Sequence, residues 1–263
     1  MRARKKFGQH FLQAAWADRL VAAIAPQSTD RFLEVGPGPG VLTTRLARRV
    51  AHLTAVEIDR DMVAALLPGA PPNVTIVPAD ILAFDIAALT VEAPLRVAGN
   101  LPYNLSSQIL FRLLAAHRAT GRLPDATVML QREVAERLEA RPGTRDYGVL
   151  SILIQLHADV HRLLTLPPGA FRPAPKVHSA VVRLTFRPPV VVVRDERLLE
   201  AMVRSMFTQR RKMLGNALEA FAATHDTHAA EALRRAGLDP TRRPETLQLA
   251  EIARLADTFE ARP

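Results

Sequence analysis

The sequence predicts an α/β domain followed by a small all-helical domain. Short apolar runs alternate with helical patterns through the first part of the chain, as expected for a parallel sheet with crossover helices. After Pro188-Pro189 the patterns change, and from Arg194 onward they all have helical spacing. We therefore expect one domain over residues 1–189 and a second over residues 190–263.

The expected elements of the first domain follow from hydrophobic periodicity. Strands are predicted at residues 31–35, 53–58, 74–77, 95–99, 128–131 and 179–186. Helices are predicted at residues 18–24, 41–50, 105–114 and 132–138, while the apolar segment 149–156 fits either a helix or a strand. In the second domain, helices are predicted at residues 195–208, 211–222, 227–236 and 244–259.

The composition excludes several classes of protein. The 263 residues contain no cysteine, which rules out disulfides, thiol nucleophiles and cysteine metal sites, and we expect no metal. No apolar run approaches the length of a membrane span, and the basic N-terminus lacks the apolar segment of a secretory signal. We therefore expect a cytoplasmic protein that does not bind a membrane.

The charge points to a polyanionic partner. There are 35 basic and 26 acidic side chains, which gives a net charge of +9. The excess lies in residues 1–12 and 112–189, whereas residues 13–111 carry two more acidic than basic side chains. This distribution is expected if a small ligand binds one part of the chain and a phosphate backbone lies across the others. Compositional drift toward arginine is the alternative explanation.

A glycine-rich turn follows the first predicted strand. Glu34-Val35 leads into Gly36-Pro37-Gly38-Pro39-Gly40, and a helical pattern begins at once. A turn of this kind brings backbone N–H groups close to a ligand at a helix N-terminus. The dinucleotide fingerprint would require glycine at position 41, which is Val41. The pattern E-x-G-x-G-x-G resembles that of the class I methyltransferases, which bind S-adenosylmethionine, although it also fits a purely structural turn.

Acidic side chains stand at the ends of the next two predicted strands. Glu57 lies where nucleotide-binding βαβ units place the acceptor for ribose hydroxyls. Asp80 is suited to accept from an adenine amino group while Ile81 packs on the ring, although by itself Asp80 also fits a turn or helix cap. Together, the three strand ends predict a nucleoside pocket.

The fourth strand ends in Asn100-Leu101-Pro102-Tyr103, which resembles the (Asn/Asp)-Pro-Pro-(Tyr/Phe) motif of methyltransferases that act on exocyclic amines. The lone pair of an adenine N6 is delocalised into the ring. Acceptors from Asn100 and the Leu101 carbonyl can hold both N6 hydrogens, so that the lone pair points at a methyl donor. Pro102 restricts the residue before it to extended conformations. Tyr103 offers a face on which an extruded base can stack, which contributes about 1–3 kcal/mol.

Two further segments carry candidate RNA contacts. In Phe171-Arg172-Pro173-Ala174-Pro175-Lys176, the aromatic ring fits a second wall against the base, with Arg172 and Lys176 near phosphates, or else a packed residue in a connector. The second is the basic cluster Arg210-Arg211-Lys212, which fits either a phosphate contact or a solvated turn.

Together these motifs resemble the small-subunit ribosomal RNA adenine dimethyltransferases almost from end to end. The resemblance rests on Asn-Leu-Pro-Tyr and on the segments at residues 7–12, 130–134, 173–177, 179–183 and 207–212. It implies a Rossmann-like class I fold, with a seven-stranded, mostly parallel sheet and a helical C-terminal domain that contacts ribosomal RNA. The implied cofactor-binding residues are His10, Leu12, Gly36, Gly38, Glu57, Asp80, Ile81 and Asn100. The implied catalytic residues are Asn100, Leu101, Pro102, Tyr103 and Phe171.

The implied activity is transfer of methyl groups from S-adenosylmethionine, which leaves S-adenosylhomocysteine, to N6 of two adjacent adenosines in a hairpin near the 3′ end of 16S rRNA. The implied substrate is the 30S particle and the expected state is a monomer. The suggested RNA contacts are Arg4, Lys5, Lys6, Arg172, Lys176, Arg210, Arg211 and Lys212. Two positions depart from the family pattern, because many relatives have asparagine at position 10 and a basic residue where this chain has Gly215.

Three other functions compete with this one. The nearest is methylation of large-subunit rRNA, as in the macrolide-resistance methyltransferases, which usually carry Asn-Ile-Pro-Tyr. Another is an RNA-binding factor that has lost catalysis, which would be expected to have a damaged glycine turn or Asn100, and both are intact here. A DNA adenine methyltransferase ranks last, because such chains lack this helical tail and many begin the motif with aspartate.

Overall fold

The computed structural model describes residues 9–260, which fall into two compact units. The first unit comprises the residues up to Ala135 together with Asp159–Arg187, and the second comprises Glu136–Ala158 together with the residues from Pro188 onward. The break lies close to the predicted one at residue 189. Unlike the prediction, the structure groups residues 136–158 with the helical part of the chain.

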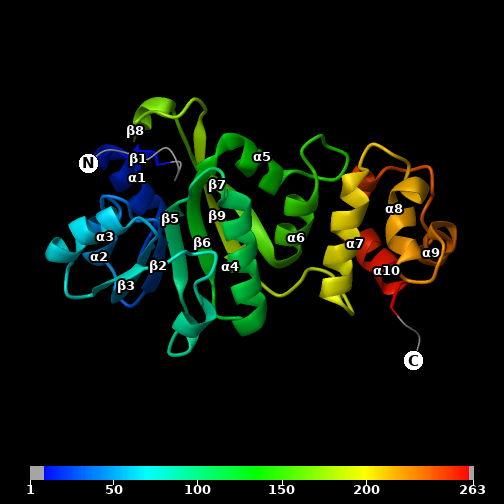
Figure 1. The fold of residues 1–263 in the computed structure, drawn as a ribbon, viewed down its shortest axis with the longest axis horizontal. Helices are drawn as coiled ribbons and strands as arrows, with labels where there is room; N and C mark the ends of the chain where they lie inside the picture. Colours follow the sequence, from blue (N-terminus) through cyan, green and yellow to red (C-terminus); the bar gives the residue numbers. More distant parts are fainter. Residues whose placement is uncertain (1–8, 261–263) are drawn as a thin grey trace. The chain divides into compact units, whose positions relative to one another are not determined.

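A seven-stranded sheet forms the centre of the first unit (Figure 1), and the predicted fold class is confirmed. Its hydrogen-bonded order is β4–β3–β2–β5–β6–β9–β7. The strands are β2 (Arg31–Val35), β3 (His52–Glu57), β4 (Val74–Pro78), β5 (Arg96–Asn100), β6 (Asp125–Gln131), β7 (Ala158–Leu166) and β9 (Ser179–Phe186). From β4 to β6, neighbouring strands are parallel, whereas β9 runs antiparallel to β6.

The helices of this unit are α1 (Ala14–Ile24), α2 (Thr43–Ala47), α3 (Arg60–Leu66) and α4 (Ser106–Thr120), and α5 (Arg132–Glu139) spans the boundary between the units. Three of them, α2 to α4, lie between successive parallel strands, and α1 precedes the first of these strands. The helix predicted over 41–50 is shorter in the structure, because the chain between Gly40 and Thr43 continues as a turn.

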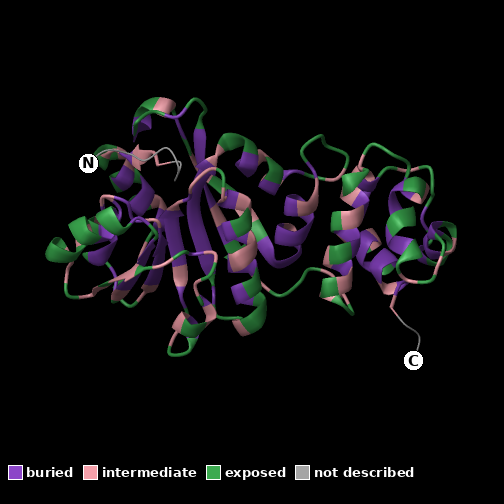
Figure 2. Ribbon diagram, viewed as in Figure 1, coloured by how far each residue is buried: buried purple, intermediate pink, exposed green. Residues whose placement is uncertain are grey.

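The central strands of the sheet are more deeply buried than the edge strand β4 (Figure 2). All but the first residue of β2 and all but the last of β6 are buried, whereas the edge strand β4 has no buried residue. On one face, residues of β2, β3, β5, β6 and β9 pack against apolar side chains of α1 and of the segment around α2. Parallel strands covered by helices are expected to have this apolar character.

An ion-pair network holds the edge of the sheet where β5 begins. The guanidinium of Arg96 bonds both carboxylate oxygens of Asp125 at 2.8 and 2.7 Å, and Asp30 at 2.6 Å. It also donates to the carbonyl of Ile24, at the end of α1, and lies 4.9 Å from the ring centroid of Phe32. Burial acts to lower the pKa of Arg96, but the two carboxylates raise it above its ordinary value. The network thus fixes α1 to the start of β5.

A short second sheet joins the beginning of the described chain to a distant loop. It pairs β1 (Phe11–Leu12) antiparallel with β8 (Phe171–Arg172). The pair is extended by a hydrogen bond from the Gln13 N–H to the carbonyl of Ala170 at 2.9 Å. Residues 9–13 are therefore held against the first unit.

The second unit is helical (Figure 1). Its helices are α6 (Val149–His157), α7 (Glu196–Thr208), α8 (Leu214–Ala223), α9 (Ala229–Ala236) and α10 (Leu249–Asp257). The ambiguous segment 149–156 is thus a helix. Short 3₁₀ turns also occur, among them Pro168–Ala170 in the first unit and Pro244–Thr246 in the second. None of the helices in residues 9–260 is both long enough and apolar enough to span a membrane.

Candidate active site

The candidate site is a cavity at the carboxyl ends of the parallel strands. Strand order reverses between β2 and β5, and ligands of open α/β sheets bind at such a switch point. The cavity has an empty volume of about 1010 Å³, which includes space open to solvent. The predicted residues around it are His10, Leu12, Gly36, Gly38, Glu57, Asp80, Ile81, Asn100, Leu101, Pro102 and Tyr103.

The glycine turn needs glycine for steric reasons. Gly36, Gly38 and Gly40 all have positive φ, at 67°, 53° and 81°. A Cβ at position 38 would lie 3.2 Å from the Phe11 ring, so the N-terminal segment packs directly on the turn. Glu57 Oε2 accepts the Gly38 N–H at 3.0 Å, and Oε1 accepts the Asp59 N–H at 2.9 Å. Glu57 thus fixes the turn, and its remaining lone pairs can accept hydroxyl groups.

Glu34 is a buried carboxyl group beside this turn. Burial raises its pKa from the ordinary 4.5 to about 8, with the nearby Thr43 hydroxyl opposing the rise and Glu57 adding to it. Although the two side chains are neighbours, Glu34 Oε2 and Thr43 Oγ1 are buried without a formed hydrogen bond. Buried polar atoms without partners are costly in a folded protein, and a ligand with an amino group would satisfy them. The site therefore fits a cationic or amine-bearing ligand at this end.

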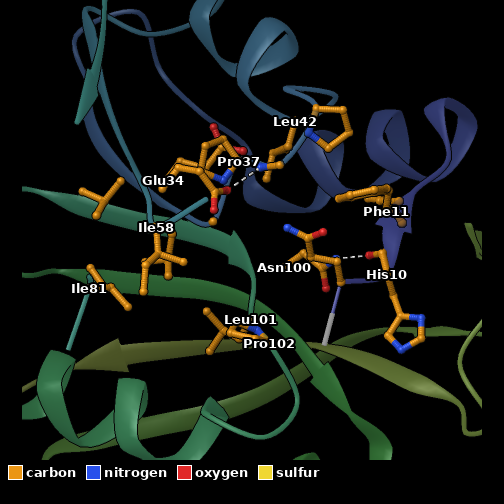
Figure 3. A pocket seen from close by; sticks show the side chains of 18 of the residues that line it. His10, Phe11, Glu34, Pro37, Leu42, Ile58, Ile81, Asn100, Leu101 and Pro102 are labelled. Atoms are coloured by element: carbon orange, nitrogen blue, oxygen red, sulfur yellow. Dashed lines mark hydrogen bonds between the residues drawn. The ribbon is translucent and has the colours of Figure 1, made fainter. Parts of the chain in front are cut away.

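The opposite wall has apolar and polar parts at the ends of β3 and β4. Ile58 is 48% exposed, although it is apolar, and it lies beside Ile81 at one end of the cavity (Figure 3). Asp80 Oδ1 accepts the Leu82 N–H at 2.9 Å, so Asp80 has the predicted turn role in addition to lining the cavity. This wall fits an aromatic ring that lies between Ile58 and Ile81. Asp80 then offers a hydrogen-bond acceptor at the edge of that ring.

Asn100 is held in one orientation. Its Nδ2 donates to the main-chain carbonyl of His10 at 2.7 Å (Figure 3). Because the amide nitrogen is engaged there, the acceptor Oδ1 is left for another partner. The next residue, Leu101, is buried and donates its N–H to the carbonyl of Met129 at 2.9 Å, which extends the register between β5 and β6. The loop is therefore anchored before a substrate arrives.

The Tyr103 side chain is held by two contacts, one at its hydroxyl and one on the face of its ring. Its hydroxyl lies 2.6 Å from Ser179 Oγ, and its ring stacks on the imidazole of His10 with centroids 5.4 Å apart. Burial raises the pKa of the Tyr103 phenol, and the Ser179 hydrogen bond partly opposes this. His10 Nδ1 in turn lies 2.8 Å from the Pro173 carbonyl, so this nitrogen is the donor. His10, where many relatives have asparagine, thus contacts Tyr103 and the Pro173 carbonyl with its ring. Its main-chain carbonyl contacts Asn100.

Phe171 does not form the predicted second wall. It is 1% exposed, belongs to the apolar core with Leu12, and is absent from the cavity lining. The reason is the β1–β8 pairing, which brings Leu12 opposite Phe171 and directs the ring inward. Phe171 is therefore a packed core residue, which is the alternative that the sequence also allowed, and the predicted stacking role is wrong.

Other residues around the cavity were not predicted. Gln9 and Phe11 come from the N-terminal segment, and Ile58 directly follows the predicted Glu57. For Ile58 a signal existed in the sequence, because an isoleucine directly after Glu57 at a strand end is in position to contact a ligand. For Phe11 the contact with Gly38 depends on the fold and has no local signal.

The basic residues differ in exposure. Arg172 is exposed in β8, Lys176 is exposed on the loop after it, and Arg211 and Lys212 are exposed after α7. Arg210 is instead bound to Glu245 at 2.7 Å. Arg4, Lys5 and Lys6 lie outside the described residues. Gly215 has its N–H bonded to the Pro240 carbonyl, and a side chain at this position would contact Pro240.

Comparison with known proteins decides the family. The family model described as ribosomal RNA adenine dimethylase matches residues 1–260. The chain belongs to this family. The ribosomal RNA small subunit methyltransferase A of Pseudomonas aeruginosa is 45% identical over 267 residues, covering 100% of this chain and 96% of the relative. The protein of the same name from Syntrophotalea carbinolica is 43% identical over 261 residues, covering 98% and 97%.

Two solved structures share the fold of this chain. A dimethyladenosine transferase from Plasmodium falciparum superimposes with a TM-score of 0.75 at 22% identity, covering 94% of this chain and 96% of the other, which shows a common fold. The 23S rRNA methyltransferase ErmE gives a TM-score of 0.65 at 26% identity, covering 95% and 99%. At 26% identity, ErmE is more distant in sequence from this chain than the small subunit methyltransferases A, which are 43–45% identical.

Proposed function

We propose that this chain transfers methyl groups from S-adenosylmethionine to N6 of two adjacent adenosines in a hairpin near the 3′ end of 16S rRNA, within the 30S particle. The observation that carries the proposal is the fixed Asn100 amide, whose Oδ1 is left as an acceptor beside the glycine-turn cavity. Relatives that are 43–45% identical are named small subunit methyltransferase A, which supports the small subunit over the large one.

The residues of the cavity fit S-adenosylmethionine. Ile58 and Ile81 offer apolar surfaces for its adenine, and Glu57 offers acceptors for the ribose hydroxyls. Glu34 lines the cavity and has a buried carboxyl oxygen without a partner, which an amino group would satisfy. When bound, the cofactor supplies a methyl group on a positively charged sulfur.

The side chains at the end of β5 orient the target amine. Asn100 Oδ1 and the Leu101 carbonyl accept the two N6 hydrogens, which directs the nitrogen lone pair toward the methyl donor. Both acceptors are anchored by the His10 and Met129 carbonyls, so little reorganisation is needed when the base arrives. No general base is needed in this scheme, because the N–H proton becomes strongly acidic once the nitrogen is alkylated.

Tyr103 stacks on the extruded base. Its hydroxyl is held by Ser179, so the plane of the ring is set before binding. Removing a base from a helical stack costs a few kcal/mol, and stacking on an aromatic ring restores about 1–3 kcal/mol of this. His10 covers part of the Tyr103 ring in the structure, so the base uses the remaining surface or displaces the imidazole.

Positive charge outside the cavity supplies affinity for RNA. Arg172, Lys176, Arg211 and Lys212 are exposed and suited to phosphate contact, as are the basic residues near the N-terminus by composition. We further propose a cytoplasmic monomer that recognises the 16S rRNA in its particle.

The test uses under-methylated ribosomal subunits and S-adenosylmethionine labelled in its methyl group. The two subunits are incubated separately with the protein, and their RNA is digested to nucleosides. We expect labelled N6,N6-dimethyladenosine from the 30S particle alone. Label in the 50S subunit, on another nucleoside, or in neither subunit would refute the proposal.

A further inference from the structure

The carboxyl end of β6 carries a glutamine to which the methyl transfer described above gives no role. Gln131 is the last residue of this strand and is partly exposed. Its side-chain amide forms no hydrogen bond within residues 9–260. The helix α5 begins at the next residue, Arg132, whose N–H is bonded to the carbonyl of His178 at 3.0 Å and not to Gln131. The amide therefore does not cap the helix and is available to a ligand.

The strand register places Gln131 on the same face of the sheet as Asn100 and Ser179. The β6–β9 ladder has no bulge, and it pairs Met129 with Val181 and Gln131 with Ser179. Met129 is also the partner of Asn100 in the parallel β5–β6 ladder. Paired residues share a face, and so do residues two apart in one strand. Asn100, Gln131 and Ser179 therefore lie on one face, at the edge of the sheet where β5 and β6 end.

Tyr103 spans the end of β6 at this edge. The residue follows β5, and its hydroxyl lies 2.6 Å from Ser179 Oγ in β9. Because β6 lies between β5 and β9 in the sheet, the phenol ring bridges the strand that ends in Gln131. The usual strand spacings place the Cα atoms of Gln131 and Asn100 about 8 Å apart. A base that stacks on Tyr103 with its amine at Asn100 thus has a ring edge within reach of the Gln131 amide.

An amide at this place suits the atoms that flank N6 of adenine. In the proposed function, Asn100 Oδ1 and the Leu101 carbonyl accept the two N6 hydrogens. The ring nitrogens N1 and N7, on either side of N6, are acceptors and need a donor. Gln131 Nε2 is such a donor. One donor beside two acceptors matches adenine, whereas guanine presents an oxygen in place of the amine and an N–H at N1.

We propose that Gln131 is a specificity-determining residue, whose Nε2 donates a hydrogen bond to a ring nitrogen flanking N6 of the target adenine. This role rests on the proposed function, because it takes an extruded adenine stacked on Tyr103 as the substrate. It extends that function by adding a contact to the ring of the base, beyond those made to the reacting amine.

The contact gains importance between the two methyl transfers. The first transfer replaces one N6 hydrogen by a methyl group, so one of the acceptors at Asn100 and Leu101 loses its hydrogen bond. The ring nitrogens are unchanged by this step. Gln131 therefore holds the monomethylated base in place for the second transfer, when the amine alone is less well held.

The test measures kcat/KM on 30S particles reconstituted with 16S rRNA in which both target adenosines are replaced by 1-deazaadenosine or by 7-deazaadenosine. Each analogue lacks one of the two ring nitrogens. Gln131→Met keeps the length of the side chain and removes the amide, and it should lower kcat/KM on unmodified particles by about tenfold. On the analogue that lacks the contacted nitrogen, wild type and variant should have the same kcat/KM. The altered reactivity of the analogue affects both proteins alike and cancels in this comparison.

The control is Gln108→Met, which changes an exposed glutamine in α4 and should leave every value unchanged. An equal loss by Gln131→Met on unmodified particles and on both analogues would overturn the proposal, because neither ring nitrogen would then depend on Gln131. Thermal unfolding should be unaltered in Gln131→Met, since the amide has no partner to lose. Gln131→Glu, whose ionised side chain keeps the shape but cannot donate, is a second variant with the same expected loss.

The products give an independent measurement. At equal total methylation, Gln131→Met should yield a higher ratio of N6-methyladenosine to N6,N6-dimethyladenosine than the wild type, and an unchanged ratio would contradict the role between the two transfers. If the wild-type chain forms no dimethyladenosine on unmodified particles, the proposed function is wrong, and this role is wrong with it. If the wild type does form it but neither analogue removes the difference between wild type and variant, the role of Gln131 alone is wrong.

Discussion

The side-chain amide of Asn100 and the main-chain carbonyl of His10 are joined by a hydrogen bond of 2.7 Å. The bond ties residues that are 90 positions apart in the sequence, and it determines which end of the amide faces the cavity. An asparagine side chain has a donor nitrogen and an acceptor oxygen. When the nitrogen is bonded elsewhere, as in Asn100, the oxygen is the atom presented to a ligand.

The first prediction concerns this amide. Asn100→Ala is expected to lower kcat by about 100-fold or more, because a preorganised acceptor for the target amine is lost. The Kd for the 30S particle is expected to change less than threefold. Single-turnover methylation and a binding titration measure the two quantities. Asn104→Ala, an exposed asparagine in the same loop, is the matched control. Equal losses of rate and affinity for Asn100→Ala would show that Asn100 only positions RNA.

The second prediction concerns the pKa of Glu34, which burial raises from 4.5 to about 8. Because the folded state binds this proton more tightly than the unfolded chain, the group stabilises the fold fully at low pH. That stability is lost as the pH rises from about 4.5 to about 8, with a slope of about 1.4 kcal/mol per pH unit. In Glu34→Gln this contribution is absent. The free energy of unfolding of the variant relative to wild type should therefore rise across this window. A constant difference would contradict the raised pKa.

Binding of S-adenosylmethionine provides a third prediction at the same residue. A cationic amino group beside Glu34 favours the carboxylate, so binding at pH 7 should release a proton from the wild-type chain. Calorimetry in two buffers of different ionisation enthalpy measures this release. We expect none attributable to this group in Glu34→Gln, together with weaker binding. Equal proton release by the wild type and by Glu34→Gln would show that the amino group of S-adenosylmethionine does not lie beside Glu34.

The fourth prediction tests the close approach of β2 and β5. A Cβ at Gly99 would lie 2.6 Å from the Val35 carbonyl oxygen, its partner in the parallel ladder. Gly99→Ala should therefore destabilise the fold by about 1–3 kcal/mol and lower kcat, because Asn100 moves with the strand. Gly69→Ala, where nothing lies within 4 Å, is the control. Denaturant unfolding measures the change in stability, and the methylation assay measures kcat. A Gly99→Ala protein with the stability and kcat of the wild type would exclude both effects.

The fifth prediction separates stability from chemistry. Arg96→Met leaves Asp30 without this cation and leaves Asp125 only its longer contact with Arg183 at 3.8 Å, which should cost about 3–5 kcal/mol. The exposed pair of Arg31 with Glu92 is a control expected to contribute about 1 kcal/mol or less. At temperatures where the Arg96→Met protein is folded, its kcat/KM should match the wild type. A loss of kcat/KM in folded protein would mean that the network also shapes the cavity.

Much of the fold followed from local patterns. The central strands are predictable because they are continuous apolar runs, and β9 occupies the predicted residues. The strand β7 was not predicted, because it is an edge strand whose polar and apolar residues mix without a clear period. Residues 136–158 join the helical unit through long-range contacts such as that of Tyr147 with Leu247, which no local pattern reveals.

The candidate site was predictable to a similar extent. Strand ends meet at one edge of a parallel sheet, so Gly36, Glu57, Asp80 and Asn100 were expected to lie together, and they line one cavity. The burial of Phe171 depends on the β1–β8 pairing, and two-residue strands leave almost no signal in a sequence. The stack of His10 on Tyr103 is likewise a contact between distant segments.

The pairing of β1 with β8 also has a consequence for biosynthesis. Phe11–Leu12 leave the ribosome early, but their partners Phe171–Arg172 are translated about 160 residues later. The β1 wall of the cavity can therefore be fixed only after about two thirds of the 263 residues have been made. A translation product that ends before β8 would lack the strand that holds this wall.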